Sequence, residues 1–365
     1  MKQTRLIMIG PFPPPVMGMA SVNKSMENLF RNNNHNKQLI IFNTSPLSLK
    51  KKISYHLYRF FKFIKILFQI SGIKTLDKVY MSTSGGYGQI YEILLLLFIR
   101  FKKLKDIIIH HHSFNYIDKK KQLSSFLFCI AGPNTIHVTL SALMAKKLKY
   151  NYSTVRLSKV LSNIYHIEKD KVQLSNRNKN NEIIMGYLSN ISEDKGIFEF
   201  IDLHSAIRKN NHNVSSIIAG PFSDDNIKKL VLEKIEKTKS IKWIGPVYAE
   251  DKRLFFRLIN YFIFPTRYFN EAEPLVIYEA FSYGVPVVSY GRGCIPEQIG
   301  SNELCGKVIP PNYPFVKNAL PWIEKRINNQ KLYQQTVSSI NKHFYLQKKI
   351  ANNNFESFFT QLISN

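Results

Sequence analysis

The sequence is poor in cysteine and contains no hydrophobic run long enough to cross a membrane. Its three cysteines, Cys129, Cys294 and Cys305, lie far apart, without the paired spacing of a zinc site or a disulfide framework. The longest apolar run covers residues 93–99, whereas a membrane-spanning helix needs about 20 residues. The N-terminal residues lead directly into an apolar strand and lack a signal-peptide profile. We therefore expect a reduced, cytoplasmic protein without structural disulfides.

Acidic residues are also scarce. The chain has 25 of them against 51 lysines and arginines, which gives a formal net charge of +26. A charge of this size indicates an anionic partner. The candidates are a nucleic acid, an acidic membrane surface and a phosphorylated ligand.

Strand-like and helix-like segments alternate along the chain. This alternation predicts an α/β fold with parallel sheets, and a length of 365 residues predicts two domains. Residues 168–182 are polar and without periodicity, which is typical of a linker. The first helix is expected to begin near Ser21, a candidate N-cap. The strands expected before the linker are residues 5–10, 39–44, 78–84, 106–112 and 135–141.

One strand–helix–strand unit stands out in the second half. Residues 260–268 and 285–290 are typical of buried strands, and a short helix is expected between them. Pro274 suits the first position of this helix, and Gly284 suits the residue just past its end. In such parallel sheets ligands bind at the carboxyl ends of the strands, where helix N-termini attract phosphate.

Acidic residues accompany this helix. Glu271 is expected in the loop before it and Glu279 within it. Carboxylates beside a phosphate site are unusual unless they accept hydrogen bonds from hydroxyl groups, such as those of ribose or a sugar. Alternatively, Glu271 and Glu273 are acids near the helix N-terminus that complement the helix dipole. The residues alone leave both interpretations open.

The stretch "NEAEPLVIYEAFSYGVPVVS" with the following "GCIPEQIG" resembles the donor-site motif of retaining GT-B glycosyltransferases of family 4, also called glycosyl transferases group 1. The resemblance is closest to members that build bacterial surface polysaccharides. It implies two Rossmann-like domains that face a central cleft. Supporting matches occur at residues 9–21, 160–167, 186–196, 217–222 and 243–266.

The resemblance also implies a domain organisation. Residues 1–167 would form the acceptor-binding domain, and residues 168–182 the linker. Residues 183–340 would form the domain that binds the nucleotide sugar. Residues 341–365 would form a helical segment that packs back on the N-terminal domain.

Most roles implied by the resemblance fall on the strand–helix–strand unit. Glu279 would bind the ribose hydroxyls, and Glu271 would contact hydroxyls of the donor sugar. Leu275 and Val276 would present backbone N–H groups to the pyrophosphate, and Lys195 would neutralise its charge. Lys195 could also be an ordinary solvated loop lysine.

Four further residues are implied to surround the donor. Val247 and Tyr248 would lie beside the base, and Gly18 would let the backbone approach the phosphate. His112 would reach the donor sugar. Strand alternation places His112 on the face opposite His111, so adjacent histidines cannot all converge on one metal ion.

The sequence departs from the family pattern at two places. Many members carry an arginine soon after the glycine that matches Gly186, where this chain has Tyr187, Leu188 and Ser189. Arg267 is a candidate replacement for that arginine. The N-terminal loop has Met17 where a glycine pair is common.

The implied reaction moves a sugar from a nucleotide-diphosphate donor to a glycan or lipid-linked glycan, with retained anomeric configuration. No cofactor or metal is expected, because no Asp-x-Asp pair is present to hold the diphosphate through a metal. A nucleotide-sugar epimerase or a phosphorylase on the same fold remains an alternative. A non-catalytic, basic, membrane-associated adaptor is another.

Residues 49–74 contain no acid and interleave lysines with aromatic residues. Such a helix can lie in the interface of an anionic membrane. It can also be an ordinary surface helix whose apolar face packs on the core. We expect a peripheral protein on the inner face of the cell membrane. Nucleic acid is not expected as a partner, because no nucleic-acid-binding module is present.

Overall fold

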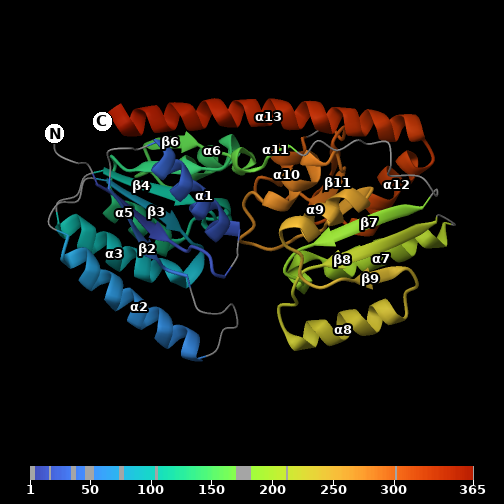
Figure 1. Cartoon of the computed structure of the whole chain (residues 1–365), viewed down its shortest axis with the longest axis horizontal. Coiled ribbons are helices and arrows are strands. Elements are labelled where there is room, and N and C mark those ends of the chain that lie inside the picture. The colour runs from blue at the N-terminus through green and yellow to red at the C-terminus, as the bar shows by residue number, and fades with distance from the viewer. Residues whose placement is uncertain are drawn as a thin grey trace. The chain divides into compact units, whose positions relative to one another are not determined.

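The computed structural model describes residues 5–15, 18–33, 38–45, 53–73, 78–102, 106–169, 182–210, 213–300 and 302–364. The chain divides into two compact units: unit 1 is Met1–His166 with Ala351–Asn365, and unit 2 is Ile167–Ile350. Each unit contains one six-stranded parallel sheet (Figure 1). The predicted α/β fold class is therefore confirmed. Most of the expected linker, residues 170–181, lies outside the described residues.

The sheet of unit 1 has the strand order β2-β1-β3-β4-β5-β6. The order in which strands are added to the sheet reverses at β1, which pairs with β2 on one side and with β3 on the other. The strands are β1 (Arg5–Gly10), β2 (Gln38–Asn43), β3 (Lys78–Thr83), β4 (Asp106–His111), β5 (Ile136–Thr139) and β6 (Leu157–Val160). The helices are α1 (Gly18–Asn33), α2 (Ile53–Ser71), η1 (Gly86–Gly88), α3 (Gln89–Phe101), α4 (Asn115–Asp118), α5 (Gln122–Ala131), α6 (Ala142–Asn151) and η2 (Asn163–His166).

The expected start of the first helix was wrong. α1 begins at Gly18, so Ser21 lies in its first turn rather than at its N-cap. Ala20 and Val22 are buried. Burial of apolar side chains therefore holds the first turn against the core, and a side-chain cap at Ser21 is not needed.

The last part of the chain belongs to the core of unit 1. Phe30 of α1 contacts Tyr80 of β3 and Phe359 edge-on, with ring centroids 5.6 and 5.1 Å apart. Tyr165 stacks on Phe355 at 3.8 Å. Both Phe355 and Phe359 lie on α13 (Gln330–Ser364), the C-terminal helix. These aromatic contacts explain why its residues from Ala351 onward cluster with unit 1.

The sheet of unit 2 has the strand order β12-β11-β10-β7-β8-β9. Strands β8 and β9 are added on one side of β7, and β10 to β12 on the other, so the strand order reverses between β7 and β10. The strands are β7 (Ile183–Leu188), β8 (Val214–Ala219), β9 (Ile241–Trp243), β10 (Tyr261–Phe264), β11 (Val287–Tyr290) and β12 (Gly306–Ile309). The helices are η4 (Glu193–Lys195), α7 (Ile197–Lys209), α8 (Asp225–Glu236), α9 (Ala249–Leu258), α10 (Leu275–Ser282), α11 (Ile295–Ile299), α12 (Phe315–Ile327) and the first part of α13.

Helices cover both faces of this sheet, as expected for a doubly wound fold. One buried cluster joins α7, α12 and the strands through residues such as Phe200, Tyr290 and Trp322. On the opposite face Phe256 of α9 packs against Phe262 of β10 and stacks on Tyr283. Two covered faces explain why β10 is apolar throughout and fully buried. No helix among the described residues is both long and apolar enough to cross a membrane.

Two of the buried histidines of unit 1 are in contact with each other. The rings of His111 and His137 lie 5.2 Å apart, and His111 Nε2 is 3.0 Å from His137 Nδ1. His111 Nδ1 also lies 2.8 Å from the Tyr116 hydroxyl. Burial lowers the pKa of His137 to about 3. Burial, followed by the neighbouring histidines, lowers the pKa of His111 well below its usual value. Both side chains are therefore neutral in the folded protein.

This burial makes stability depend on pH. The folded-state pKa values lie below the unfolded value of about 6.5, so the unfolded chain binds protons first as the pH falls. Above about pH 6.5 the two neutral histidines do not lower the free energy of unfolding. Below that pH, each of them lowers it by up to about 1.4 kcal/mol per pH unit. Thermal denaturation should give a lower Tm at pH 5.5 than at pH 7.5, and His137→Gln should reduce this difference. Equal Tm values at both pH values would contradict the assignment.

Candidate active site

The candidate site lies where unit 2 reverses its direction of growth. β7 and β10 are parallel neighbours, with Tyr261 opposite Met185 and Phe262 opposite Gly186. The loops after both strands therefore start from the same edge of the sheet. The loop after β7 carries Lys195, and the loop after β10 carries Glu271. This edge is where open α/β sheets bind ligands.

The two loops are in direct contact. Gly196 has a φ of +80°, and a Cβ built on it would lie 2.2 Å from the Pro265 carbonyl oxygen. Only glycine tolerates both this conformation and this approach. In addition, the Arg267 backbone N–H donates to the Asp194 carbonyl at 2.8 Å. The position of Lys195 is thus fixed relative to the loop that carries Glu271.

Lys195 and Glu271 form an ion pair, with Nζ 2.5 Å from Oε2 and side chains only 16% and 12% exposed. The Thr266 hydroxyl donates to the same oxygen at 3.3 Å. The Lys195 ammonium also lies over the Tyr268 ring, 4.4 Å from its centroid. An ammonium group has three donors, so Lys195 can bind an anion without releasing Glu271. This pairing disfavours the interpretation of Lys195 as a solvated loop residue.

The N-terminus of α10 follows directly. Pro274 has a ψ of 122°, so it precedes the helix and is not its first residue as predicted. Leu275 and Val276 are partly exposed and supply the first N–H groups, which lack partners within a helix. Gly284 ends the helix as predicted, with a φ of +66°.

Glu273 has a different role from Glu271. It is buried, and its Oε1 accepts a hydrogen bond from the Tyr278 hydroxyl at 2.8 Å. Glu271 is paired with Lys195. Neither is a solvated acid that only complements the helix dipole.

Glu279 lies in the second turn of α10 and pairs with Lys252 of α9, with Nζ 2.5 Å from Oε1. Its Oε2 is buried and has no hydrogen-bond partner among the described residues. Lys252 was missed in the sequence. The sequence feature that could have indicated Lys252 is its position one helical turn after Tyr248, within the segment expected to contact the base. Val247 is buried and Tyr248 is 59% exposed, just before α9.

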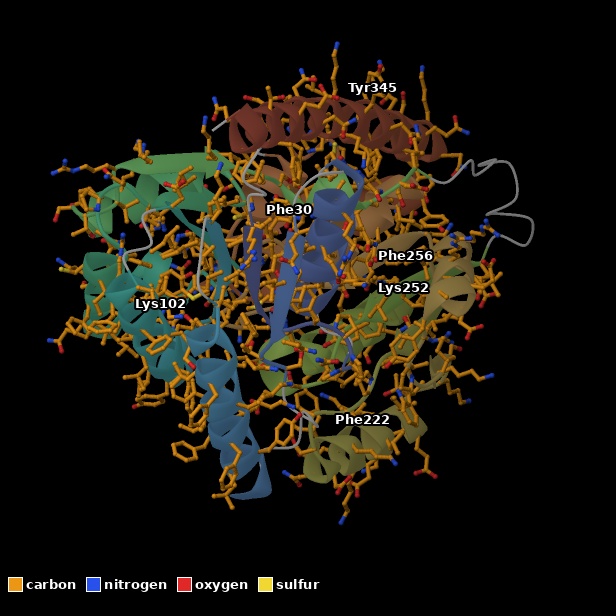
Figure 2. The ribbon with its side chains drawn as sticks, turned by 60° about the vertical axis from the view of Figure 1, so that its left-hand side comes forward. Phe30, Lys102, Phe222, Lys252, Phe256 and Tyr345 are labelled. Atoms are coloured by element: carbon orange, nitrogen blue, oxygen red, sulfur yellow. The ribbon has the colours of Figure 1, made fainter. Side chains whose placement is uncertain are left out.

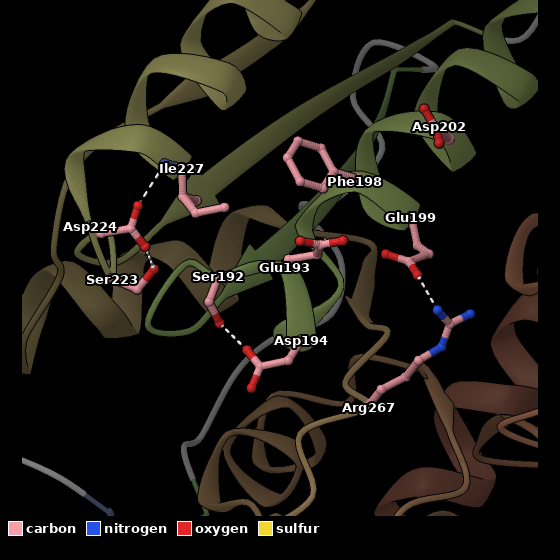
Figure 3. A pocket seen from close by; sticks show the side chains of 10 residues that line it. All are labelled: Ser192, Glu193, Asp194, Phe198, Glu199, Asp202, Ser223, Asp224, Ile227 and Arg267. Carbon is pink, nitrogen blue, oxygen red and sulfur yellow. Dashed lines mark hydrogen bonds and ion pairs between the residues drawn. The ribbon is translucent and has the colours of Figure 1, made fainter.

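Arg267 is engaged elsewhere. Its guanidinium lies 3.0 Å from Glu199, donates to the Tyr290 hydroxyl and stacks over the Tyr290 ring at 4.5 Å. Among the described residues, its guanidinium makes no hydrogen bond or ion pair with Lys195 or Glu271. Its proposed service to a phosphate stays a prediction. Arg267 borders a cavity of about 740 Å³ (Figure 3), lined also by Ser192, Glu193, Asp194, Phe198, Glu199, Asp202, Ser223, Asp224 and Ile227.

The residues at the position of the missing arginine cannot supply its charge. Tyr187 and Leu188 are buried, and Ser189 is partly exposed. The Tyr187 hydroxyl donates to the Lys195 carbonyl at 3.3 Å. Tyr187 therefore supports the backbone of the lysine loop.

His112 and Gly18 belong to unit 1. His112 follows β4, and its ring lies 4.1 Å from that of His110, while His111 contacts Tyr116 and His137 instead. The predicted alternation is confirmed. Burial, followed by the charge of His166, lowers the pKa of His112 to about 3. A Cβ on Gly18 would meet no atom within 4 Å. Their approach to a donor stays a prediction.

Within the part of the chain that the structure describes, no group of three or more His, Cys, Asp or Glu residues could hold a metal ion. All three cysteines are free.

Comparisons with known proteins bear on the second half of the chain and on the fold. Residues 168–342 match the family model of Glycosyl transferases group 1. No curated protein matches the sequence. Among solved structures, HepE (Alr3699) of Anabaena, in complex with UDP, is 16% identical, with a TM-score of 0.67 over 100% of both chains. HepE has also been solved with UDP-glucose.

Two further structures are similar. Sucrose-phosphate synthase of Thermosynechococcus elongatus is 12% identical, with a TM-score of 0.73 over 99% of this chain and 100% of that one. WaaB, a lipopolysaccharide outer core galactosyltransferase, is 15% identical, with a TM-score of 0.65 over 97% and 99% of the chains. At these identities the similarity shows the fold. The chain therefore has the GT-B fold, and the match at residues 168–342 supports a glycosyltransferase enzyme.

Proposed function

We propose that the protein is a retaining family 4 enzyme that transfers a sugar from a nucleoside diphosphate to a glycan. The observation that carries this proposal is the Lys195–Glu271 pair beside the start of α10. It combines a cation and free N–H groups for a diphosphate with a carboxylate for sugar hydroxyls. The complexes of HepE with UDP and UDP-glucose support a donor of this class.

In the proposed reaction the bond between the sugar anomeric carbon and the diphosphate oxygen breaks. The acceptor hydroxyl oxygen forms the new bond on the same face, and its proton passes to the departing phosphate. Negative charge develops on the diphosphate, where Lys195 and the N–H groups of Leu275 and Val276 would stabilise it. Glu271 would orient the sugar through its hydroxyls, and His112 would contact the sugar. No metal or other cofactor takes part.

The nucleoside would bind further along α10. Glu279 lies four residues after Leu275, a rise of about 6 Å along the helix axis, which a nucleotide can bridge. Glu279 would accept hydrogen bonds from the ribose hydroxyls. Val247 and Tyr248 would flank the base, and Gly18 would admit the backbone to the phosphate.

We further propose a lipid-linked glycan as the acceptor, in the synthesis of lipopolysaccharide or another surface polysaccharide. The similarity to WaaB supports this pathway. An epimerase or a phosphorylase could use the same donor site, and transfer of labelled sugar to an acceptor would separate these activities. A non-catalytic adaptor would not need the two paired carboxylates.

The proposed place of work is the inner face of the cell membrane, and two helices of unit 1 support it. On α2, Phe63, Ile66 and Ile70 are buried, so part of this helix packs on the core as the alternative interpretation held. Other apolar residues of α2 and an outward stripe of α3 are exposed. We call these the α2–α3 surface: Leu57, Phe60, Phe61, Phe68, Ile90, Leu94, Leu97 and Phe101.

The two helices form one continuous surface. Phe63 of α2 packs on Tyr91 of α3 with ring centroids 5.2 Å apart, and Arg59 lies over the same ring. The helix α2 has no acidic residue, and its Lys65 is exposed. Apolar side chains bordered by cations fit an anionic lipid surface. Lys50, Lys51 and Lys52 lie outside the described residues.

Vesicle binding tests this surface. Replacing Phe61, Phe68 and Leu94 with Ser should weaken binding to phosphatidylglycerol vesicles at least about tenfold, because apolar burial is lost. High salt should release the wild-type protein. The control is Tyr345→Ser, an exposed aromatic of α13 that Figure 2 labels. Equal binding to neutral and anionic vesicles, or an equal loss in the control, would refute the membrane proposal.

Lys195 and Glu279 should act on different parts of the donor. Lys195→Ala should reduce kcat/KM by more than about a hundredfold, since it removes a contact at developing charge. It should weaken binding of the nucleoside diphosphate more than that of the nucleoside. Glu279→Ala should weaken both equally, because both contain ribose. Calorimetry would contradict these roles if diphosphate affinity survived Lys195→Ala or if Glu279→Ala discriminated between the ligands.

Arg267→Ala is the companion variant. Its guanidinium contacts Glu199 and Tyr290, so a smaller loss than in Lys195→Ala is expected. A loss as large as that of Lys195→Ala would show that Arg267 fills the role of the missing arginine.

Activity should survive EDTA. The proposed stabilisation of the diphosphate comes from Lys195 and a helix N-terminus rather than from a divalent cation. Turnover measured with and without chelator should therefore agree within about twofold. Loss of turnover in EDTA with recovery on adding Mg²⁺ or Mn²⁺ would refute the metal-independent mechanism.

A further inference from the structure

Lys252 of unit 2 is a second lysine paired with a carboxylate of the proposed donor site, and it has no role in the function proposed above. It lies on α9, one turn before Phe256, and both are labelled in Figure 2. Its Nζ is 2.5 Å from Oε1 of Glu279, and the two side chains are 31% and 19% exposed. The pair joins α9 to α10 across 27 residues of sequence.

The unusual feature is the other oxygen of Glu279. Its Oε2 is buried and has no hydrogen-bond partner among the described residues. Two carboxylates of unit 1 have partners at both oxygens. Glu27 pairs with Lys24 through one oxygen and with Arg31 through the other. Glu92 accepts from Thr83 at one oxygen and from Ser84 at the other. An unpartnered buried oxygen is costly, and a ligand that donates to it removes that cost.

The backbone beneath Lys252 is fixed. Phe255 and Phe256 are both 1% exposed and anchor α9 to the sheet. Phe256 stacks on Tyr283, the residue just after α10, with ring planes 15° apart. The helices α9 and α10 are thus locked side by side. Lys252 therefore reaches Glu279 from a constant position and can set the orientation of its carboxylate.

We propose that Lys252 is a positioning residue for the donor. Its ammonium holds Oε1 of Glu279, so that Oε2 is presented to the ribose hydroxyls. It also offsets a carboxylate charge that burial would otherwise disfavour. This inference rests on the proposed nucleotide site, and it makes ribose recognition a property of the Lys252–Glu279 pair rather than of Glu279 alone.

The test compares UDP with 2′,3′-dideoxyuridine diphosphate by calorimetry. The wild-type protein should bind UDP at least about tenfold more tightly, because hydrogen bonds to a charged group are lost with the hydroxyls. In Lys252→Met the ratio should fall below about threefold, through weaker UDP binding with unchanged binding of the dideoxy analogue. Lys252→Arg should keep the ratio above threefold.

A matched control separates positioning from general damage. Lys234→Met removes a similar ion pair, 2.8 Å from Asp202, on α8 of the same unit, and should leave the ratio unchanged. Equal weakening of both ligands by Lys252→Met, or an unchanged ratio, would overturn the role of Lys252 while the donor site stood. Failure of the wild-type protein to bind UDP, GDP or ADP would overturn the proposed function and this inference with it.

Discussion

The parallel pairing of β7 with β10 is the constraint on which the candidate site depends. These strands are adjacent only because the chain reverses its direction of growth between them. Their loops consequently leave the same edge of the sheet, and Gly196 lets one pack against Pro265 of the other. A side chain at Gly196 would separate the loops. The contact between Lys195 and Glu271 is a product of this close approach.

Acidic residues are scarce in this chain, and the two carboxylates of the candidate site are both paired with lysines. In a chain with 51 basic and 25 acidic residues, Glu271 and Glu279 are each held by one lysine. Such pairs let carboxylates remain partly buried, ready for hydroxyl groups, without making the site anionic. In the proposed site, the two lysines would supply positive charge for a diphosphate, and the two carboxylates would supply acceptors for hydroxyl groups.

Unit 1 shows how one helix can satisfy two interpretations. The sequence of α2 suits both a core helix and a membrane-interface helix, and the structure divides these features among its residues. Phe63 and Ile66 face the core, whereas Phe61 and Phe68 face solvent. The outward stripe of α3 extends the exposed part. Apolar residues at both kinds of position explain why periodicity alone could not choose between the two interpretations.

The sequence by itself determined the features that depend on local period and turn chemistry. These include the alternating α/β elements, the end of α10 at Gly284, and the opposite directions of His111 and His112. The start of α1 was missed because burial, which no local pattern reports, replaced the expected cap at Ser21. Local patterns also placed Glu271 before the helix and Glu279 within it.

Only the tertiary structure decided which charges meet. Lys195 and Glu271 are 76 residues apart, and Lys252 and Glu279 are 27 apart. Their contacts depend on strand order and on the packing of Phe256 against Tyr283. The sequence offered Arg267 as a candidate for binding a phosphate, whereas the fold places its guanidinium against Glu199 and Tyr290. Side-chain partners at such separations follow from the packing of whole elements, which the local sequence does not encode.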